Sequence, residues 1–143
     1  MSALIATAEE TVQELKDAFM FLDEWTDRYG YLIDLGKKLP DFPDALRVDE
    51  NLMMGCQSQV WLVSHMEGDR LRFLAASDAM IVGGLIGLLL AVYDKRTPAE
   101  ILAVDPNFLD ELGLNHHLSP SRSNGLHSMV KNIMAAASRH LKG

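Results

Sequence analysis

Apolar residues between positions 7 and 40 recur at three- and four-residue steps, the spacing of one face of an α-helix. Thr7, with Glu10 three residues later, predicts a capping box at the start of a first helix. We expect Asp23 to cap a second helix, which Pro40 ends. The inner positions of the two helices are Val12, Leu15, Phe19 and Leu22, then Trp25, Tyr29, Leu32, Ile33 and Leu39. These helices are predicted to form one wall of the core.

The period changes after a surface loop that is expected from Pro40 to Glu50. Two runs rich in β-branched, aromatic and other apolar residues, Ser58 to Met66 and Arg70 to Ala76, flank a turn with Gly68 and indicate a β-hairpin. One face of the second strand would carry Leu71, Phe73 and Ala75. We expect a third antiparallel strand near Asn51 to Met54, because a two-stranded hairpin alone is only marginally stable.

The most apolar segment, Ala79 to Val92, is predicted to be a buried helix capped by Ser77 or Asp78. It falls short of the ~18 to 20 residues that span a bilayer. Its glycines match neither the dinucleotide-binding nor the Walker spacing, so we interpret them as sites of close packing against the sheet. They are Gly83, Gly84 and Gly87.

Three pairs in the last third join a capping residue to proline at a first helical position, and predict two short helices and a long one. The pairs are Thr97-Pro98, Asp105-Pro106 and Ser119-Pro120. The long helix has a clear apolar stripe at Leu126, Met129, Val130, Ile133, Met134, Ala137 and Leu141. Arg122 falls in its first turn, where a cation opposes the helix dipole. Arg122 is therefore a candidate anion partner, and the alternative is a solvated surface arginine.

The composition predicts one domain over residues 1–143, with 48% hydrophobic residues and a formal net charge of −7. That charge argues against a broad nucleic-acid surface, which needs a basic face. Met1 to Ala6 lacks the features of a secretory signal. We expect a cytoplasmic protein that does not bind nucleic acid or a membrane.

Cys56 is the only cysteine in the chain, so no internal disulfide can form, which fits a reducing compartment. It follows Gly55 and precedes Gln57 and Ser58, just before the first predicted strand. A lone cysteine is often an inert buried residue. The polar neighbours favour a reactive cysteine in a loop, and Cys56 is the candidate nucleophile.

Two histidines raise alternatives for this cysteine. His116 and His117 with Cys56 are a poor zinc site, because adjacent histidines point in different directions and one cysteine lacks the paired spacing, so we expect no metal. A Cys-His hydrolase would use Cys56 as nucleophile and His117 as base, with Asp78 or Asn124 as orienting group. The absence of a recognisable oxyanion-hole motif argues against it. The third alternative is an interaction module with an inert cysteine.

Four separated motifs resemble the SufE/CsdE family. They are Gly55-Cys56-Gln57-Ser58-Gln59-Val60-Trp61; Ser77-Asp78-Ala79 with Ile81-Val82 and Gly84-Leu85-Ile86; Tyr93-Asp94 with Thr97-Pro98; and His117-Leu118-Ser119-Pro120-Ser121-Arg122-Ser123-Asn124-Gly125-Leu126. The resemblance covers roughly Trp25 to Leu141, and Ser119 stands where the family often has threonine. It implies an α+β fold, a small antiparallel sheet of about three strands packed on several helices.

The resemblance also implies a function. The protein would be a sulfur acceptor that takes persulfide sulfur on Cys56 from a pyridoxal-phosphate-dependent cysteine desulfurase of the SufS or CsdA type. It would stimulate that desulfurase and pass the sulfur on to an iron–sulfur scaffold or another acceptor. It would not itself be an enzyme and would need no cofactor, because pyridoxal phosphate belongs to the partner.

The same resemblance suggests roles around the cysteine. Gly55, Gln57, Ser58 and Arg122 would support the cysteine loop. Gln57 and Ser58 would either order it by hydrogen bonds or merely solvate it. Asp78, first of all a predicted cap, would be a possible partner contact. Our hypothesis is that Arg122 and the amides that begin the last helix lie near the cysteine and stabilise its anionic forms.

Overall fold

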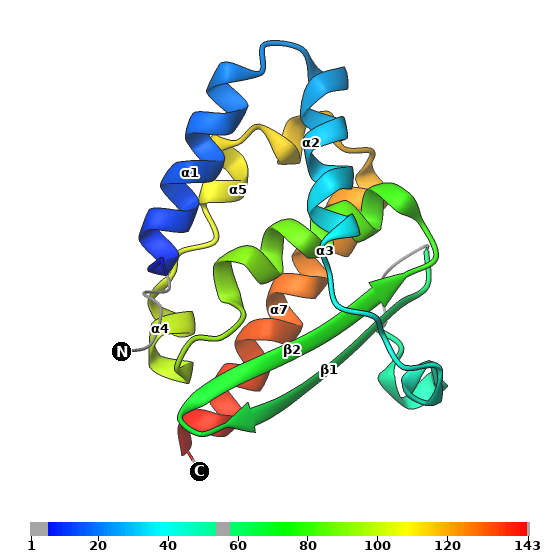
Figure 1. Ribbon diagram of the computed structural model, residues 1–143, viewed down its shortest axis with the longest axis vertical. Helices are drawn as coiled ribbons and strands as arrows, with labels where there is room; N and C mark the ends of the chain where they lie inside the picture. The colour runs from blue at the N-terminus through cyan, green and yellow to red at the C-terminus, as the bar shows by residue number, and fades with distance from the viewer. Residues whose placement is uncertain (1–5, 54–57, 143) are drawn as a thin grey trace.

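The computed structural model describes residues 6–53 and 58–142. They form the expected α+β fold, in which a long two-stranded hairpin lies against a group of helices (Figure 1). The helices are α1 (Ala8–Phe21), α2 (Trp25–Lys37), α3 (Met80–Tyr93), α4 (Pro98–Ala103), α5 (Phe108–Glu111), α6 (Leu114–His117) and α7 (Pro120–Lys142). The strands are β1 (Val60–Glu67) and β2 (Arg70–Ser77), and two 3₁₀ turns, η1 (Asp44–Leu46) and η2 (Asp49–Asn51), lie in the loop predicted from 40 to 50.

The first helix begins as predicted. The Thr7 hydroxyl accepts a hydrogen bond from the Glu10 amide at 3.1 Å, and the Glu10 carboxylate accepts one from the Thr7 amide at 2.9 Å. The predicted Asp23 cap of α2 is wrong, because Glu24 is the N-cap residue and its side chain makes no capping bond. The side chain of Arg28 connects the two helices instead. It donates to the carbonyls of Phe19 and Leu22 at the end of α1 and lies over the Trp25 ring.

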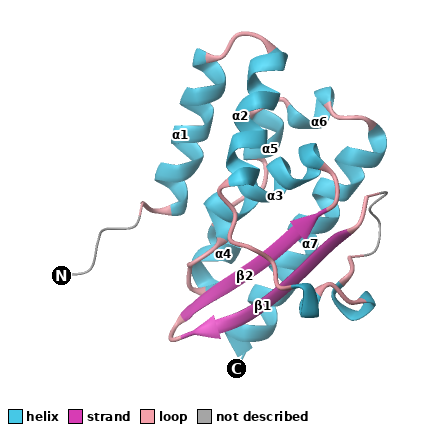
Figure 2. Ribbon diagram, turned by 45° about the vertical axis from the view of Figure 1, so that its right-hand side comes forward, coloured by secondary structure: helices cyan, strands magenta, loops and turns pink. Residues whose placement is uncertain are grey.

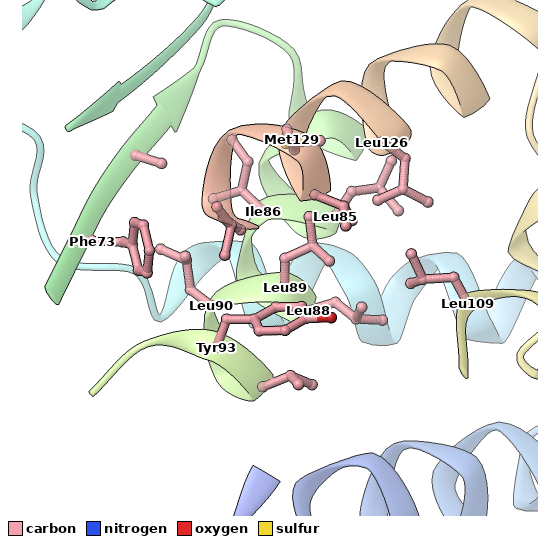
Figure 3. Packing of buried hydrophobic residues seen from close by; sticks show 14 of the residues in the cluster. Phe73, Leu85, Ile86, Leu88, Leu89, Leu90, Tyr93, Leu109, Leu126 and Met129 are labelled. Carbon is pink, nitrogen blue, oxygen red and sulfur yellow. The ribbon is translucent and has the colours of Figure 1, made fainter. Parts of the chain in front are cut away.

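Helix α3 is the centre of the core, and Figure 3 shows its side chains between β2 and α7. Its glycines do permit close packing, but the partner is α2 and not the sheet as predicted. A Cβ atom built on Gly84 would lie 2.6 Å from the carbonyl oxygen of Leu32, and one on Gly87 would lie 2.7 Å from the carbonyl carbon of Leu35. The two helices therefore touch through their backbones, which only glycine allows.

The hairpin pairs Val60 with Ser77 through to Glu67 with Arg70, and Gly68 in its turn has a φ of +65°. The predicted inner face is confirmed, since Leu71, Phe73 and Ala75 are all buried. The expected third strand is absent from the described residues, where Leu52 forms only an isolated bridge to Trp61. The hairpin is stabilised by helices instead of a third strand. Its inner face shares one small internal space with side chains of α3 and α7, lined in part by Val60, Ala75, Ile86, Leu90, Met129 and Ile133.

The helix starts of the last third are confirmed at two of three places. Thr97 forms a capping box with Glu100 ahead of Pro98, and α7 begins at Pro120. Asp105 is not a helix cap, because its carboxylate accepts from the Asn107 amide in a turn and α5 starts only at Phe108. A further short helix, α6, was not predicted.

None of the helices in the described residues is long and apolar enough to cross a membrane.

Candidate functional site

Three predicted site residues, Gly55, Cys56 and Gln57, lie outside the described residues, which stop at Met53 and resume at Ser58. The predictions for those three residues remain predictions. The structure does describe both ends of the segment that carries them, and it describes Ser58, Asp78 and Arg122.

The two ends of the cysteine segment are joined at their base. The Met53 amide donates to the Val60 carbonyl at 2.8 Å, and Leu52 forms its bridge to Trp61 just beyond. The guanidinium of Arg47 lies over the Trp61 ring, 5.0 Å from its centroid, so the preceding loop is packed against the same strand. The described residues on either side of the cysteine segment are thus held together at one point beside the start of β1.

Asp78 adds a second pair of contacts at that point, two hydrogen bonds with Gln59. Its carboxylate accepts a hydrogen bond from the Gln59 amide at 3.1 Å, and its own amide donates to the Gln59 carbonyl at 3.4 Å. The predicted capping role is wrong for Asp78 and for Ser77. Ala79 is the N-cap residue of α3 without a side-chain bond to the helix, and the Ser77 hydroxyl accepts from the Ala79 amide. The Asp78 carboxylate binds the Gln59 amide next to the start of β1, so it does not cap the helix.

A cleft of about 330 Å³ opens next to Ser58 between α3 and the start of α7. Figure 2 shows the first turn of α7 on the same side of the molecule as the start of β1. The cleft brings together Ser58 and Arg122, which lie 64 positions apart in the sequence. Its lining consists of Ser58, Val82, Leu85, Ser119, Ser121, Arg122, Gly125 and Met129.

The polar side of this cleft is built from the first turn of α7. The Arg122 amide donates to the Ser119 hydroxyl at 3.4 Å, a long capping bond, and the hydroxyls of Ser119 and Ser121 lie 3.4 Å apart. Arg122 is exposed, and no carboxylate of the described residues lies within ion-pair distance of it. The positive end of a 23-residue helix and a guanidinium therefore face the same cleft, an arrangement that favours an anion.

His117 contributes to the packing of the helices. Its ring stacks on that of Trp25, with centroids 3.9 Å apart and planes 21° apart, and its carbonyl accepts from the Tyr29 hydroxyl at 3.0 Å. It does not line the cleft. Within residues 6–53 and 58–142 no group of three or more metal-ligating side chains comes together.

Sequence reasoning missed most of the cleft lining. Ser119 was predicted only as a helix cap, and Ser121 and Gly125 were quoted only within a motif. The available signal was the spacing of Arg122, Gly125 and Met129, which follow one another at three and four residues and so share a face of α7. Val82 of α3 faces them only because of the tertiary packing, which no local pattern reveals.

The fold and site define a small α+β protein with an anion-favouring cleft that Ser58 and Arg122 line together. Residues 13–137 match the model of the SufE family, described as an Fe-S metabolism associated domain. The chain belongs to this family.

Individual relatives agree with that assignment. An uncharacterised SufE-like protein of Rhizobium meliloti (strain 1021) is 44% identical over 136 residues, which cover 92% of this chain and 97% of the relative. A second one, of Rhizobium etli, is 46% identical over 132 residues, 89% of each chain. The solution structure of a hypothetical protein from Thermus thermophilus superposes with a TM-score of 0.77 at 22% identity, covering 93% of this chain and 97% of that one, and shows that the fold is shared.

Proposed function

We propose that this protein is a sulfur carrier that accepts sulfane sulfur on Cys56 from a pyridoxal-phosphate-dependent cysteine desulfurase. The observation that carries the proposal is the cleft in which Ser58, two residues from Cys56 in the chain, meets Arg122 at the start of α7. Membership of a family associated with Fe–S metabolism supports it.

The transfer step needs a thiolate and no net redox change. The Cys56 thiolate attacks the terminal sulfur of the desulfurase persulfide, the S–S bond of that persulfide breaks, and the desulfurase cysteine leaves as a thiolate. Cys56 then carries the transferred sulfur as its own persulfide. Both the attacking and the product forms are anions near neutral pH, so a nearby cation and helix N-terminus would lower the cost of forming them.

Arg122 and the first turn of α7 are the groups that we assign to this stabilisation. Gly55 would give the segment its backbone freedom, and Gln57 and Ser58 would order it by hydrogen bonds. The hydrogen bonds between Met53 and Val60 and between Gln59 and Asp78 would keep the cysteine segment beside the cleft while it contacts a partner protein.

On this proposal the protein is a relay and not a catalyst for a free substrate. The desulfurase, of the SufS or CsdA type, would hold the pyridoxal phosphate and be stimulated when Cys56 removes its sulfur. An iron–sulfur scaffold or another sulfur acceptor would receive the sulfur next. Asp78 is exposed, and we assign it as a possible contact of the desulfurase.

The test is an intact-mass measurement after incubation with a cysteine desulfurase, pyridoxal phosphate and cysteine. We expect a gain of one sulfur atom that a reductant reverses and that Cys56→Ser abolishes. Arg122→Ala should slow the gain about three- to tenfold, the scale of one partly exposed charge interaction. Arg139→Ala is the matched control, because Arg139 is exposed on the same helix but does not line the cleft.

Two results would count against the proposal, at different levels. The absence of any sulfur gain with several desulfurases, while Cys56 reacts normally with an alkylating agent, would overturn the acceptor function. Equal rates for the Arg122→Ala and Arg139→Ala variants would remove the role of Arg122 and leave the acceptor function standing.

A further inference from the structure

A second cleft, of about 400 Å³, lies at the other end of α3. It is formed where the last turns of α2 and α3 meet the start of α1 and the middle of β2. Four cationic side chains and one carboxylate line it, in a chain whose formal net charge is −7. The cations are Lys38, Arg72, Lys95 and Arg96, and the carboxylate is Asp94.

Arg96 is the unusual member of this group, because it is 4% exposed and has only neutral partners. Its guanidinium donates to the carbonyls of Val92, at 3.0 Å, and Ala6, and to the Thr11 hydroxyl at 3.4 Å. No carboxylate of the described residues lies within ion-pair distance of it. Burial lowers the pKa of Arg96, as expected for a desolvated cation. Buried charges in proteins are normally paired directly with an opposite charge, whereas Asp94 and Glu100 act on this one without an ion pair.

The one carboxylate in the lining is already engaged. Asp94 accepts the Phe73 amide at 2.8 Å and the Nε of Arg72 at 3.4 Å, so it belongs to the edge of β2. Arg72 also pairs with Glu67 outside the cleft. Asp94 therefore forms no ion pair with Arg96, and its charge and that of Glu100 act on the guanidinium only from a longer distance.

The two lysines add cations that no described carboxylate pairs with. Lys95 is the only described residue other than glycine with a positive φ, +65°, a conformation that glycine or asparagine adopts more cheaply. Its amide donates to the Leu71 carbonyl at 3.1 Å, and the Leu71 amide donates to the Arg96 carbonyl at 2.8 Å, which fixes the backbone in this place. Lys38, the C-cap residue of α2, lies in the lining with it.

Lysines near helix ends also neutralise the helix dipole, and that role alone would explain Lys38. It does not explain a buried guanidinium whose hydrogen-bond partners are all neutral, or a lysine held in a left-handed conformation. The rest of the lining is apolar and comes from α2 and α3, including Leu35, Leu39, Pro40, Leu90 and Ala91. The volume falls within the range of small-molecule sites.

We propose that this cleft binds a small organic anion, a phosphate monoester or carboxylate with an apolar body. The head group would supply the directly bound negative group that Arg96, Lys38 and Lys95 lack, and the apolar body would cover Leu39 and Leu90. The site is separate from the sulfur cleft, since the two clefts use opposite ends of α3.

The test is an NMR titration of the full chain with phenyl phosphate, benzoate, inorganic phosphate and benzyl alcohol. We expect saturable amide shifts at Leu39, Lys95 and Arg96 with phenyl phosphate or benzoate, weaker binding of inorganic phosphate and none of benzyl alcohol. The aromatic anion that binds more tightly identifies the head group as phosphate or carboxylate.

Two surface variants and a matched control test the residues. Lys95→Gly removes a cation and keeps the positive φ, so it should weaken anion binding about three- to tenfold without lowering stability. Lys38→Ala should weaken it by a similar factor. Lys37→Ala removes the same charge one residue earlier, outside the lining, and should change the affinity less than about twofold, as long-range screened charges do.

The proposal is overturned if neither aromatic anion gives saturable shifts at these amides up to about 10 mM, the weak end of ligand affinities. It is equally overturned if Lys37→Ala and Lys38→Ala weaken binding alike, because the effect would then be one of overall charge. Persulfide formation on Cys56 should be unchanged in Lys95→Gly, so a failure here leaves the sulfur function untouched.

Discussion

The backbone contact between α2 and α3 gives a sharp prediction for Gly84→Ala. The added Cβ would lie 2.6 Å from the Leu32 oxygen, 2.7 Å from the Leu32 carbonyl carbon and 3.1 Å from the Ile33 amide nitrogen. All three neighbours are backbone atoms, so no side chain can rotate away and α2 must shift. Overpacking of this kind costs about 1–3 kcal/mol. The better helix propensity of alanine offsets about 1 kcal/mol of it.

Gly83→Ala is the matched control, because a Cβ at that position meets nothing within 4 Å. It carries the propensity gain of about 1 kcal/mol without the clash. The two variants, one residue apart on the same helix, should therefore differ in unfolding free energy by about 1–3 kcal/mol in favour of Gly83→Ala. For a chain of this size that corresponds to a difference in Tm of about 2–10 °C.

The measurement is urea unfolding followed by circular dichroism, with thermal melts of the same samples. If Gly84→Ala proves as stable as Gly83→Ala, α2 and α3 are not in backbone contact, and our account of the glycines is wrong.

Two further predictions concern single polar groups. Asp78→Ala removes the acceptor of the Gln59 amide and should lower the free energy of unfolding in urea by about 1 kcal/mol. Asp78→Asn keeps an acceptor and should recover much of that loss. Equal losses in the two variants would argue against this hydrogen bond. Tyr93 has a buried hydroxyl without a partner among the described residues, and burial raises its pKa to about 12. Since the unfolded tyrosine ionises near pH 10, stability should fall as the pH rises from about 10 towards 12. Tyr93→Phe should flatten that decline at little cost near neutral pH, and an unchanged alkaline decline would exclude Tyr93 as its source.

Local sequence patterns predicted the elements well because their causes are local. The Thr7 capping box, the hairpin turn at Gly68 and the start of α7 at Pro120 each depend on residues within four positions. Two wrong caps have local causes: Glu24, next to Asp23, is the N-cap residue of α2, and the Asn107 amide takes the Asp105 carboxylate. A third error arises where a distant partner competes. Asp78 satisfies the rules for a helix cap, but the Gln59 amide across the hairpin takes its carboxylate.

The sites show the same limit. Arg122 could be singled out because a cation in a first helical turn is unusual, yet its neighbours Val82 and Leu85 come from another helix and no spacing reveals them. Arg96 had no local signal at all, since burial and the neutrality of its hydrogen-bond partners are properties of the packed structure. Family resemblance predicted the chemistry of Cys56, which no described contact tests.

The hydrogen bond from Met53 to Val60 fixes the start of the segment that carries Cys56. Cys56 is three residues beyond Met53, and an extended chain spans at most about 3.6 Å per residue, so its Cα lies within about 11 Å of the Met53 Cα. The hydrogen bond holds Met53 itself against β1. A donor sulfur buried deeper than this below its own protein surface would be out of range. On the proposed function, a desulfurase would have to present its persulfide close to its own surface, or loosen this anchor when it binds.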